Sequence, residues 1–221
     1  MYQHLDEQGQ ALPFTANKAV CVGQNYLAHM QEMGGAPAKQ AVLFIKPKTA
    51  ITGLANGVMI PSDVGEVHYE LELAILIAKP LRNASPKELD DAVWGYAAAL
   101  DLTLRDVQLA LKQSGHPWER AKAFDKSCVL SHFKPINRLS ELADVELHFE
   151  QNAQLKQQGT TKQMIRNLST LLCEASRCFT LEPGDVLLTG TPAGVGPLKV
   201  GDKLAFKVAD ISVETEVVLS E

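Results

Sequence analysis

Hydrophobic and polar residues alternate with a period of two along much of the chain, which is the pattern of half-buried β-strands. This alternation, together with short continuous apolar runs, predicts strands at 18–22, 41–46, 57–60, 66–79, 93–101, 145–151, 185–189, 203–208 and 210–218. Short segments with helical periodicity predict helices at 26–33, 86–91, 103–113 and 168–178. Ser85 and Asn167 are the expected caps of the second and the last helix. Because helices and strands do not alternate regularly, we expect a strand-rich α+β fold with short helices rather than a Rossmann fold or a TIM barrel.

Length and composition fit a single catalytic domain over residues 1–221, with a short N-terminal lead at 1–17. The net charge of −5 argues against nucleic-acid binding, which needs a basic face. The apolar runs are too short to span a membrane, and the N-terminus has neither the basic nor the apolar segment of a signal peptide. The cysteines lack metal-type Cys-x-x-Cys spacing. We therefore expect reduced thiols and a cytoplasmic location.

The strand at 66–79 carries two acidic side chains where its apolar half begins. Alternation places Glu70 and Glu72 on the same face, about 7 Å apart by strand rise. Two like charges so placed repel, and partial burial adds several kcal/mol per ion that a cation or a proton has to offset. A solvated polar face on an edge strand explains the pattern without a ligand. A hard divalent cation such as Mg²⁺ is the usual partner of clustered carboxylates.

A third carboxylate, Asp101, ends the apolar strand at 93–101, where the chain turns into the next helix. It can stabilise the N-terminus of that helix, or Thr103 can cap the helix instead. It can equally deliver a third oxygen ligand to a metal held by a neighbouring strand. Glu70, Glu72 and Asp101 with open positions left over would suit Mg²⁺ or Mn²⁺ better than zinc, which prefers His and Cys.

A candidate catalytic pair lies on the first predicted helix. His29 and Glu32 are three residues apart, so they share a helix face and the carboxylate can orient the imidazole. Such a pair can act as a general base towards water, whereas a surface pair on a polar turn is the structural alternative. Gly34 and Gly35 follow, which suggests a segment able to close over a ligand.

Other polar positions are candidates for ligand contacts. Lys46 ends an apolar strand before a proline, where it can bind a substrate carboxylate or extend to solvent. Arg105 lies one helical turn after the aspartate and can pair with it, while Gln108 and Lys122 can reach ligand oxygens. The loop at 188–196 follows an apolar strand but lacks the P-loop signature, so nucleotide binding is not expected. Its backbone N–H groups and threonine hydroxyls suit a carboxylate, although a Gly/Pro turn explains it as well.

Together these motifs resemble the fumarylacetoacetate hydrolase family, in order and spacing, from about residue 18 to the C-terminus. They are His68-Tyr-Glu70-Leu-Glu72, Asp101-Leu-Thr-Leu-Arg105-Asp106-Val-Gln108, Lys122-Ala-Phe-Asp and Thr189-Gly-Thr-Pro-Ala-Gly-Val-Gly. The chain is similar in length to the short branch of the family, which includes acylpyruvases and oxaloacetate decarboxylases or tautomerases. Many relatives have Arg-Asn-Tyr where this chain has Gln24-Asn25-Tyr26, so a cationic contact is not expected at position 24.

The resemblance implies a mixed β-sandwich or β-roll fold and a homodimer. It implies Mg²⁺ or Mn²⁺ on Glu70, Glu72 and Asp101, and a catalytic dyad of His29 and Glu32. It also implies contacts to the substrate from Lys46, Gln108, Lys122 and Thr191. We expect Lys122 to be a catalytic residue beside the dyad, and Tyr26 and Arg105 to be further substrate contacts.

In such a site a 2-oxo acid would chelate the metal through its carboxylate and keto oxygen, and the metal would stabilise an enolate at C3. Acylpyruvate hydrolysis with dyad-activated water, oxaloacetate decarboxylation and keto–enol tautomerisation all use this enolate, so the sequence leaves the three open. Two alternatives remain. One is an isomerase or decarboxylase of hydroxymuconate-type diacids, and the other is a protein that binds small acids without turnover.

Overall fold

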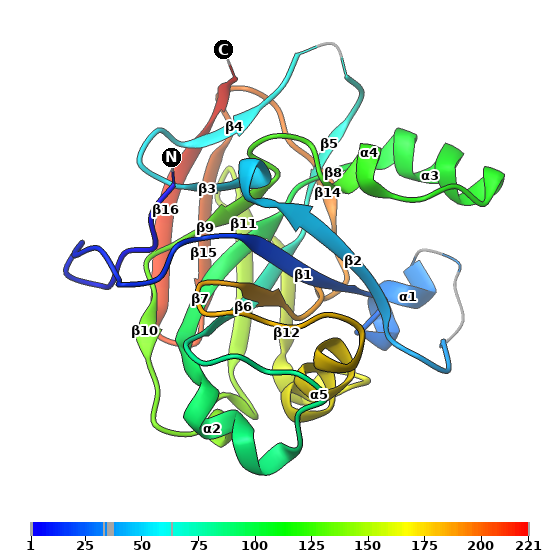
Figure 1. Ribbon diagram of the computed structural model, residues 1–221. Helices are drawn as coiled ribbons and strands as arrows, with labels where there is room; N and C mark the ends of the chain where they lie inside the picture. Colours follow the sequence, from blue (N-terminus) through cyan, green and yellow to red (C-terminus); the bar gives the residue numbers. More distant parts are fainter. Residues whose placement is uncertain (1, 33, 35–37, 63, 221) are drawn as a thin grey trace.

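The computed structural model describes residues 2–32, 34, 38–62 and 64–220, which form three β-sheets with short helices around them (Figure 1). The predicted strand-rich fold is confirmed. The largest sheet has the strand order β2-β1-β13-β6-β7-β9-β3, and β10 pairs with β7. Its strands are β1 (Lys18–Gly23), β2 (Val42–Pro47), β3 (Ile51–Gly53), β6 (Leu71–Ile77), β7 (Val93–Asp101), β9 (Cys128–Leu130), β10 (Lys134–Pro135) and β13 (Val186–Leu188).

The second sheet has the order β12-β11-β15-β16-β4, and the third has the order β14-β5-β8. The strands of the second are β4 (Val58–Ile60), β11 (Glu146–Gln151), β12 (Gln154–Thr160), β15 (Lys203–Val208) and β16 (Ile211–Leu219). Those of the third are β5 (Val67–Tyr69), β8 (Thr103–Leu104) and β14 (Gly196–Pro197).

The α-helices are short and lie around the sheets (Figure 1). They are α1 (Leu27–Glu32), α2 (Leu89–Ala92), α3 (Arg105–Ser114), α4 (Glu119–Lys122) and α5 (Leu168–Cys178). Single 3₁₀ turns are η1 (Lys48–Ala50), η2 (Pro86–Glu88), η3 (Leu139–Leu142) and η4 (Thr161–Gln163). Among the described residues, no helix is long and apolar enough to cross a membrane.

Several local predictions are confirmed. The predicted strands at 93–101 and 203–208 coincide with β7 and β15. Ser85 forms a capping box at η2, and the Asn167 side chain accepts a hydrogen bond from the Thr170 N–H at the start of α5. These features depend on neighbouring residues, which is why the sequence predicts them.

Three predictions are wrong in detail. The strand at 66–79 is broken at Glu70 into β5 and β6, which belong to different sheets. Thr103 lies in β8 and does not cap α3, which begins at Arg105 without a side-chain cap. The strands β3, β9 and β12 were not predicted, since two have three residues and the third is largely polar. Nor were the two-residue strands β8, β10 and β14, which are too short to show a pattern. The last residue of the predicted helix at 26–33 lies outside the described residues.

Both faces of the large sheet are buried, which explains the continuous apolar run of β6. Leu71, Leu73 and Ile75 face the core shared with the second sheet, where Phe149 and Phe206 also pack. The alternate residues face a second cluster that is rich in small side chains, namely Ala19, Cys21, Ala74, Ala97, Ala99 and Cys128. By the same alternation Glu72 on β6 and Asp101 on β7 lie on this second face, beyond the end of the small-residue cluster.

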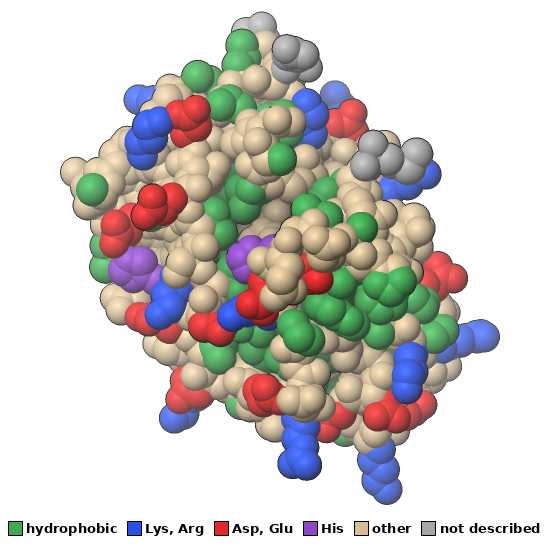
Figure 2. Space-filling view, turned by 90° about the vertical axis from the view of Figure 1, so that its left-hand side faces the viewer, with side chains coloured by type: hydrophobic (Ala, Val, Ile, Leu, Met, Phe, Trp, Pro, Cys, Tyr) green, Lys and Arg blue, Asp and Glu red, His purple; other side chains and the backbone are tan. Residues whose placement is uncertain are grey.

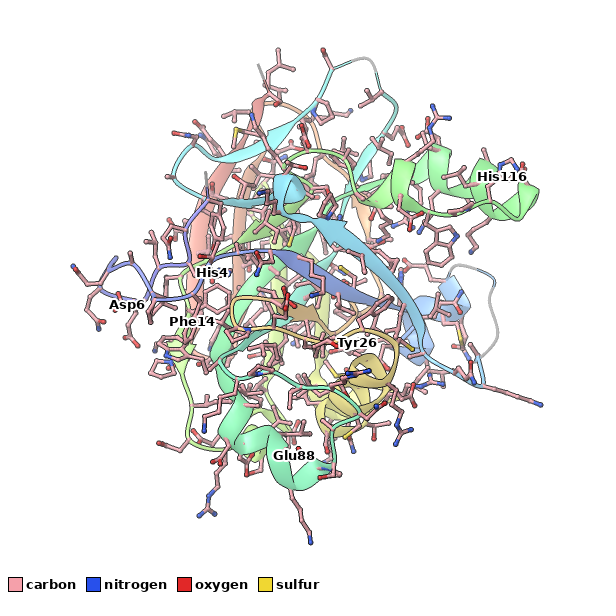
Figure 3. The ribbon with its side chains drawn as sticks, in the orientation of Figure 1. His4, Asp6, Phe14, Tyr26, Glu88 and His116 are labelled. Carbon is pink, nitrogen blue, oxygen red and sulfur yellow. The ribbon has the colours of Figure 1, made fainter. Side chains whose placement is uncertain are left out.

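The N-terminal segment covers part of the second face. His4 and Phe14 lie on this segment (Figure 3), and the His4 ring packs edge-on against Phe133 at 5.0 Å between ring centroids. Hydrophobic side chains also gather on the outer surface seen in Figure 2. That surface faces away from α1 and α3, which lie on the opposite side in Figure 1. The N-terminal side of the molecule is therefore remote from the site described next.

Candidate active site and metal centre

The three predicted carboxylates lie side by side at one end of the large sheet. Leu71 pairs with Leu100 in the register of β6 and β7, and the Asp101 N–H donates to the Glu70 carbonyl (2.9 Å). Glu70 and Asp101 are thus cross-strand neighbours, and Glu72 lies two residues along the same face. One oxygen of each carboxylate lies within 4.8 Å of the other two, and all three side chains are buried.

Basic side chains offset part of this negative charge. Lys122 at the end of α4 donates to Glu70 (Nζ to Oε2, 2.7 Å) and to Asp101 (Nζ to Oδ2, 2.7 Å). Arg105 pairs with Glu70, so the pairing of Arg105 with Asp101 that we expected from the sequence is wrong. Lys46 on β2 also pairs with Asp101 (Nζ to Oδ1, 2.8 Å). Glu70 and Asp101 are therefore both paired with basic side chains of the protein.

Glu72 differs from the other two carboxylates because it lacks such a partner. Its carboxylate accepts a hydrogen bond from the Gly190 N–H (2.6 Å), and no basic nitrogen of the described residues lies within 4.0 Å of it. Burial raises the pKa of Glu72 well above its ordinary value, and the neighbouring carboxylates of Asp101 and Glu70 raise it further. For Glu70 burial acts in the same direction, but its two basic partners outweigh it and lower the pKa. A buried carboxylate without a counter-ion, beside two others, fits a hard divalent cation.

A buried glutamine holds the junction at which the chain passes from β5 to β6. The Leu71 N–H donates to Oε1 of Gln157 (2.9 Å). Nε2 of Gln157 donates to Thr191 Oγ1 (2.7 Å) and to the Pro192 carbonyl (2.7 Å). Gln157 therefore ties the start of the carboxylate strand to the loop that follows β13. It lies in a largely polar strand, so its burial was not expected from the sequence.

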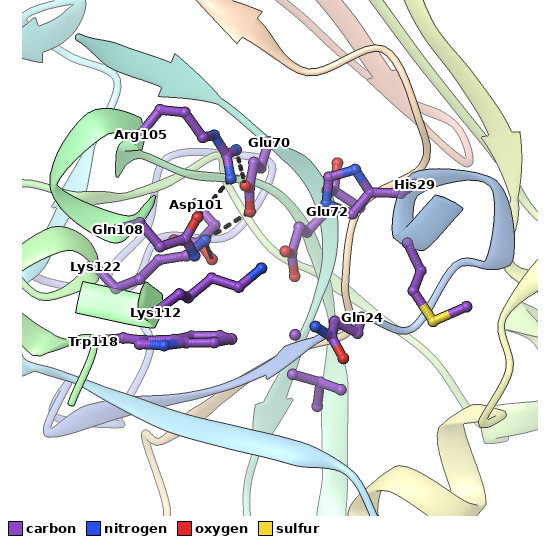
Figure 4. A pocket seen from close by; sticks show the side chains of 14 residues that line it. Gln24, His29, Glu70, Glu72, Asp101, Arg105, Gln108, Lys112, Trp118 and Lys122 are labelled. Carbon is purple, nitrogen blue, oxygen red and sulfur yellow. Dashed lines mark hydrogen bonds and ion pairs between the residues drawn. The ribbon is translucent and has the colours of Figure 1, made fainter. Parts of the chain in front are cut away.

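The predicted pair on α1 is present. Nδ1 of His29 and Oε2 of Glu32 are 3.1 Å apart, and Glu32 also accepts a hydrogen bond from the Gly194 N–H (3.2 Å). Because Nδ1 faces Glu32, Nε2 is the ring nitrogen left to act in the pocket that His29 borders (Figure 4). Gly34 adopts a left-handed backbone (φ 66°), while Gly35 lies outside the described residues.

A pocket opens in front of the carboxylates (Figure 4). Its cavity measures about 40 Å³, which is room for a metal ion and a water-sized group. Arg105, Gln108, Lys122 and Thr191 line it, as expected of residues predicted to contact a substrate. Arg105 also donates to Gln108 (Nη1 to Oε1, 2.6 Å), which orients the amide. The structure thus brings these four residues together with the carboxylates and His29.

Two other predicted substrate contacts, Lys46 and Tyr26, do not border this pocket. Lys46 is fully buried and donates to the Leu102 carbonyl (3.2 Å) and to Ser127 Oγ (2.9 Å), besides pairing with Asp101. Tyr26 is buried as well, and burial raises its pKa, followed by the charge of Glu72. The structure places Lys46 where it fixes Asp101, with its ammonium group enclosed by protein oxygens.

The pocket wall also includes Gln24, Lys112 and Trp118. Gln24 adopts a left-handed backbone (φ 61°) directly after β1. Lys112 and Trp118 were not predicted. Lys112 follows Gln108 by four residues and therefore lies on the same helix face, a spacing from which the sequence could have identified it. Trp118 precedes α4 and reaches the pocket only through tertiary packing, next to Phe44 and Gly23.

Comparisons with known proteins agree with this geometry. The model of the fumarylacetoacetate hydrolase C-terminal family matches residues 18–218. The chain is 49% identical to the oxaloacetate tautomerase YcgM of Escherichia coli strain K12, over 98% of this chain and 100% of that protein. It resembles the crystal structure of a fumarylacetoacetate hydrolase family protein from Yersinia pestis, with a TM-score of 0.95 and 46% identity over 98% of this chain and 100% of that one. It also resembles a fumarylpyruvate hydrolase from Pseudomonas aeruginosa in complex with Mn²⁺ and pyruvate, with a TM-score of 0.91 and 30% identity over 99% and 96% of the two chains.

Proposed function

This chain belongs to the fumarylacetoacetate hydrolase family, and on that premise we propose that its main reaction is the keto–enol tautomerisation of oxaloacetate. It is a metal-dependent enzyme that acts on small 2-oxo acids. The substrates named for its relatives, oxaloacetate and fumarylpyruvate, belong to the same class. The tautomerase name of a relative that is 49% identical over nearly the whole chain favours this reaction over decarboxylation and acylpyruvate hydrolysis.

Glu70, Glu72 and Asp101 hold one divalent cation, either Mg²⁺ or Mn²⁺, in this proposal. The observation that carries it is Glu72, a buried carboxylate with a raised pKa and no basic partner within the described residues. Mn²⁺ in the related fumarylpyruvate hydrolase supports a hard cation, and an all-carboxylate ligand set suits Mg²⁺ as well. When bound, the cation supplies Lewis acidity that stabilises negative charge developing on the keto oxygen of a 2-oxo acid.

His29 moves the proton at C3 of the substrate. From enol to keto, Nε2 delivers a proton to C3 while the enol hydroxyl gives its own proton to solvent water, and His29 then regains a proton from solvent, so atoms and charge balance. Glu32 holds the imidazole by its Nδ1 and so orients Nε2 towards the pocket. Lys122 and Arg105 are already fixed by Glu70, and we assign them, with Gln108 and Thr191, to the substrate oxygens. Lys46 acts as a positioning residue for Asp101.

Three rates measured on the purified protein test this function. They are the enol-to-keto conversion of oxaloacetate, its decarboxylation, and the hydrolysis of acetylpyruvate, each with Mg²⁺, with Mn²⁺ and with a chelator. We expect tautomerisation to have the highest kcat/KM and to be lost in the chelator. A higher kcat/KM for either other reaction would refute the assignment. Binding of Mg²⁺ and oxalate without any turnover would favour the non-catalytic alternative.

A homodimer and a cytoplasmic location complete the proposal. The free state of all four cysteines supports a reducing compartment. The dimer is an expectation from family membership, and the mass of the protein in solution by light scattering tests it. A monomer at micromolar concentration would contradict it.

A further inference from the structure

Lys112 is a cation of the pocket that the proposed reaction leaves without a role. It lies near the end of α3, half-buried, and its side chain points into the pocket (Figure 4). Within the described part of the chain, no carboxylate oxygen lies within 4.0 Å of its ammonium group. Arg105 and Lys122, by contrast, are both engaged with Glu70. Lys112 is therefore the basic group of the wall that no carboxylate of the described residues engages.

The charges around the pocket indicate what this ligand is. The wall contains as many cationic as anionic side chains, namely Arg105, Lys112 and Lys122 against Glu70, Glu72 and Asp101. Behind the wall, Lys46 at Asp101 and Glu32 at His29 cancel as well, counted with the His29 imidazole neutral, the form that accepts the C3 proton. A bound divalent cation therefore leaves an excess of two positive charges, which a dicarboxylate neutralises. Without Lys112 the excess is one, which suits a monocarboxylate.

We propose that Lys112 binds the distal carboxylate of a four-carbon 2-oxo diacid and gives the site its preference for dicarboxylic over monocarboxylic 2-oxo acids. This inference rests on the proposed function. One end of the substrate faces the carboxylate cluster, so its far carboxylate points to the part of the wall formed by Lys112, Gln24 and Trp118. The Gln24 amide is neutral, so it cannot neutralise a carboxylate. Among the described residues of the wall, Lys112 is the only cation without an ion pair.

The size of the cavity limits the length of the ligand. At about 40 Å³ it holds a metal ion and a water-sized group, so a four-carbon diacid enters only when the wall moves, and a half-buried lysine without a partner is the side chain best able to move. The competing explanation is structural. A lysine in the last turn of a helix stabilises the helix dipole whatever the pocket contains.

Two pairs of ligands isolate the distal carboxylate. Malate is lactate with one further carboxylate, and neither ligand is turned over by tautomerisation, so both enantiomers of each serve as probes. Their Kd values are measured by calorimetry with saturating Mg²⁺ on the wild type, Lys112→Met, Lys112→Arg and Lys87→Met. Lys87 is exposed on η2 and controls for the loss of one positive charge. The second pair, oxaloacetate and pyruvate, is compared by KM for the first and by competitive inhibition for the second.

We expect Lys112→Met to weaken malate binding by about tenfold to a hundredfold, the scale of one charge-assisted hydrogen bond, and to leave lactate binding unchanged. Lys112→Arg should retain most of the preference, and Lys87→Met all of it. An equal loss for malate and lactate, an unchanged malate Kd, or a lower Tm with unchanged ligand preference would each overturn the inference. A wild type that prefers malate but does not tautomerise oxaloacetate would refute the proposed function and leave the role of Lys112 intact.

Discussion

Replacing Glu70 and Glu72 by glutamine should have opposite effects on the stability of the metal-free protein, although the two side chains are two residues apart. Glu70 accepts hydrogen bonds from Arg105 and Lys122 in a buried setting. Its neutral replacement leaves two buried cations with one carboxylate fewer. Breaking a buried ion pair costs about 3–5 kcal/mol, and the amide oxygen recovers part of this, so we expect a loss of about 3 kcal/mol for Glu70→Gln. For a chain of this size that corresponds to a fall in Tm of about 6–12 °C.

Glu72 has the opposite environment. Burial and its two carboxylate neighbours already disfavour its charge, and its one hydrogen bond comes from the Gly190 N–H, which an amide oxygen can also accept. Glu72→Gln should therefore leave the stability of the metal-free protein unchanged or raise its free energy of unfolding by up to about 1–2 kcal/mol, with the same or a higher Tm. Both variants should lose the stabilisation that Mg²⁺ gives the wild type, about 2.7 kcal/mol at a hundred times Kd.

Thermal unfolding at pH 7, with chelator and then with Mg²⁺, measures both effects. Glu214→Gln provides a matched control, because Glu214 is an exposed glutamate on β16. The reasoning would be refuted if Glu72→Gln destabilised the metal-free protein as much as Glu70→Gln, since that would mean that Glu72 is compensated by the protein itself. Retention of the Mg²⁺ shift by either variant would exclude that carboxylate as a ligand.

The same contacts lead to three further predictions. His29→Ala should lower the rates of tautomerisation and acetylpyruvate hydrolysis by about 10²–10⁴-fold and the rate of decarboxylation far less. Equal losses in all three assays would show that His29 does not transfer the proton. Gln157→Leu leaves the buried Leu71 N–H without an acceptor, so the free energy of unfolding measured in urea should fall by about 1–3 kcal/mol. The kcat/KM should fall as well. An unchanged urea midpoint would contradict the positioning role of Gln157. The raised pKa of Glu72 means that the folded metal-free protein binds an extra proton, so its stability should fall as pH rises from about 4.5 through that pKa. Mg²⁺ binding in this pH range should release protons, and Glu72→Gln should abolish both effects.

The sequence predicted the carboxylates and the dyad because these depend on local periodicity. Glu70 and Glu72 share a strand face, and His29 and Glu32 share a helix face, whatever the rest of the chain does. Asp101 lies opposite Glu70 because of the register between β6 and β7. The periodicity of a single segment does not predict this pairing. The resemblance to a family supplied that link before the structure did.

The errors also have physical causes. The alternation from 66 to 73 passes directly into the apolar run that ends at 78, with no interruption at Glu70. The break at Glu70 is imposed by the pairing of β5 with β8 and β14, two-residue strands that have no pattern of their own. Lys46 shares a face of β2 with the buried Phe44, so its long side chain turns inward to Asp101. From the sequence we expected Lys46 to bind a substrate carboxylate or to extend to solvent, and only the tertiary structure shows that it is buried and paired with Asp101.

The position of the metal tests the central claim most directly. Anomalous scattering from crystals grown with Mn²⁺ and oxalate locates the ion without any assumption about the reaction. The account predicts one ion, with carboxylate oxygens of Glu70, Glu72 and Asp101 all within about 2.0–2.6 Å of it. An ion bound elsewhere, or one that leaves Glu72 without a contact, would contradict the account.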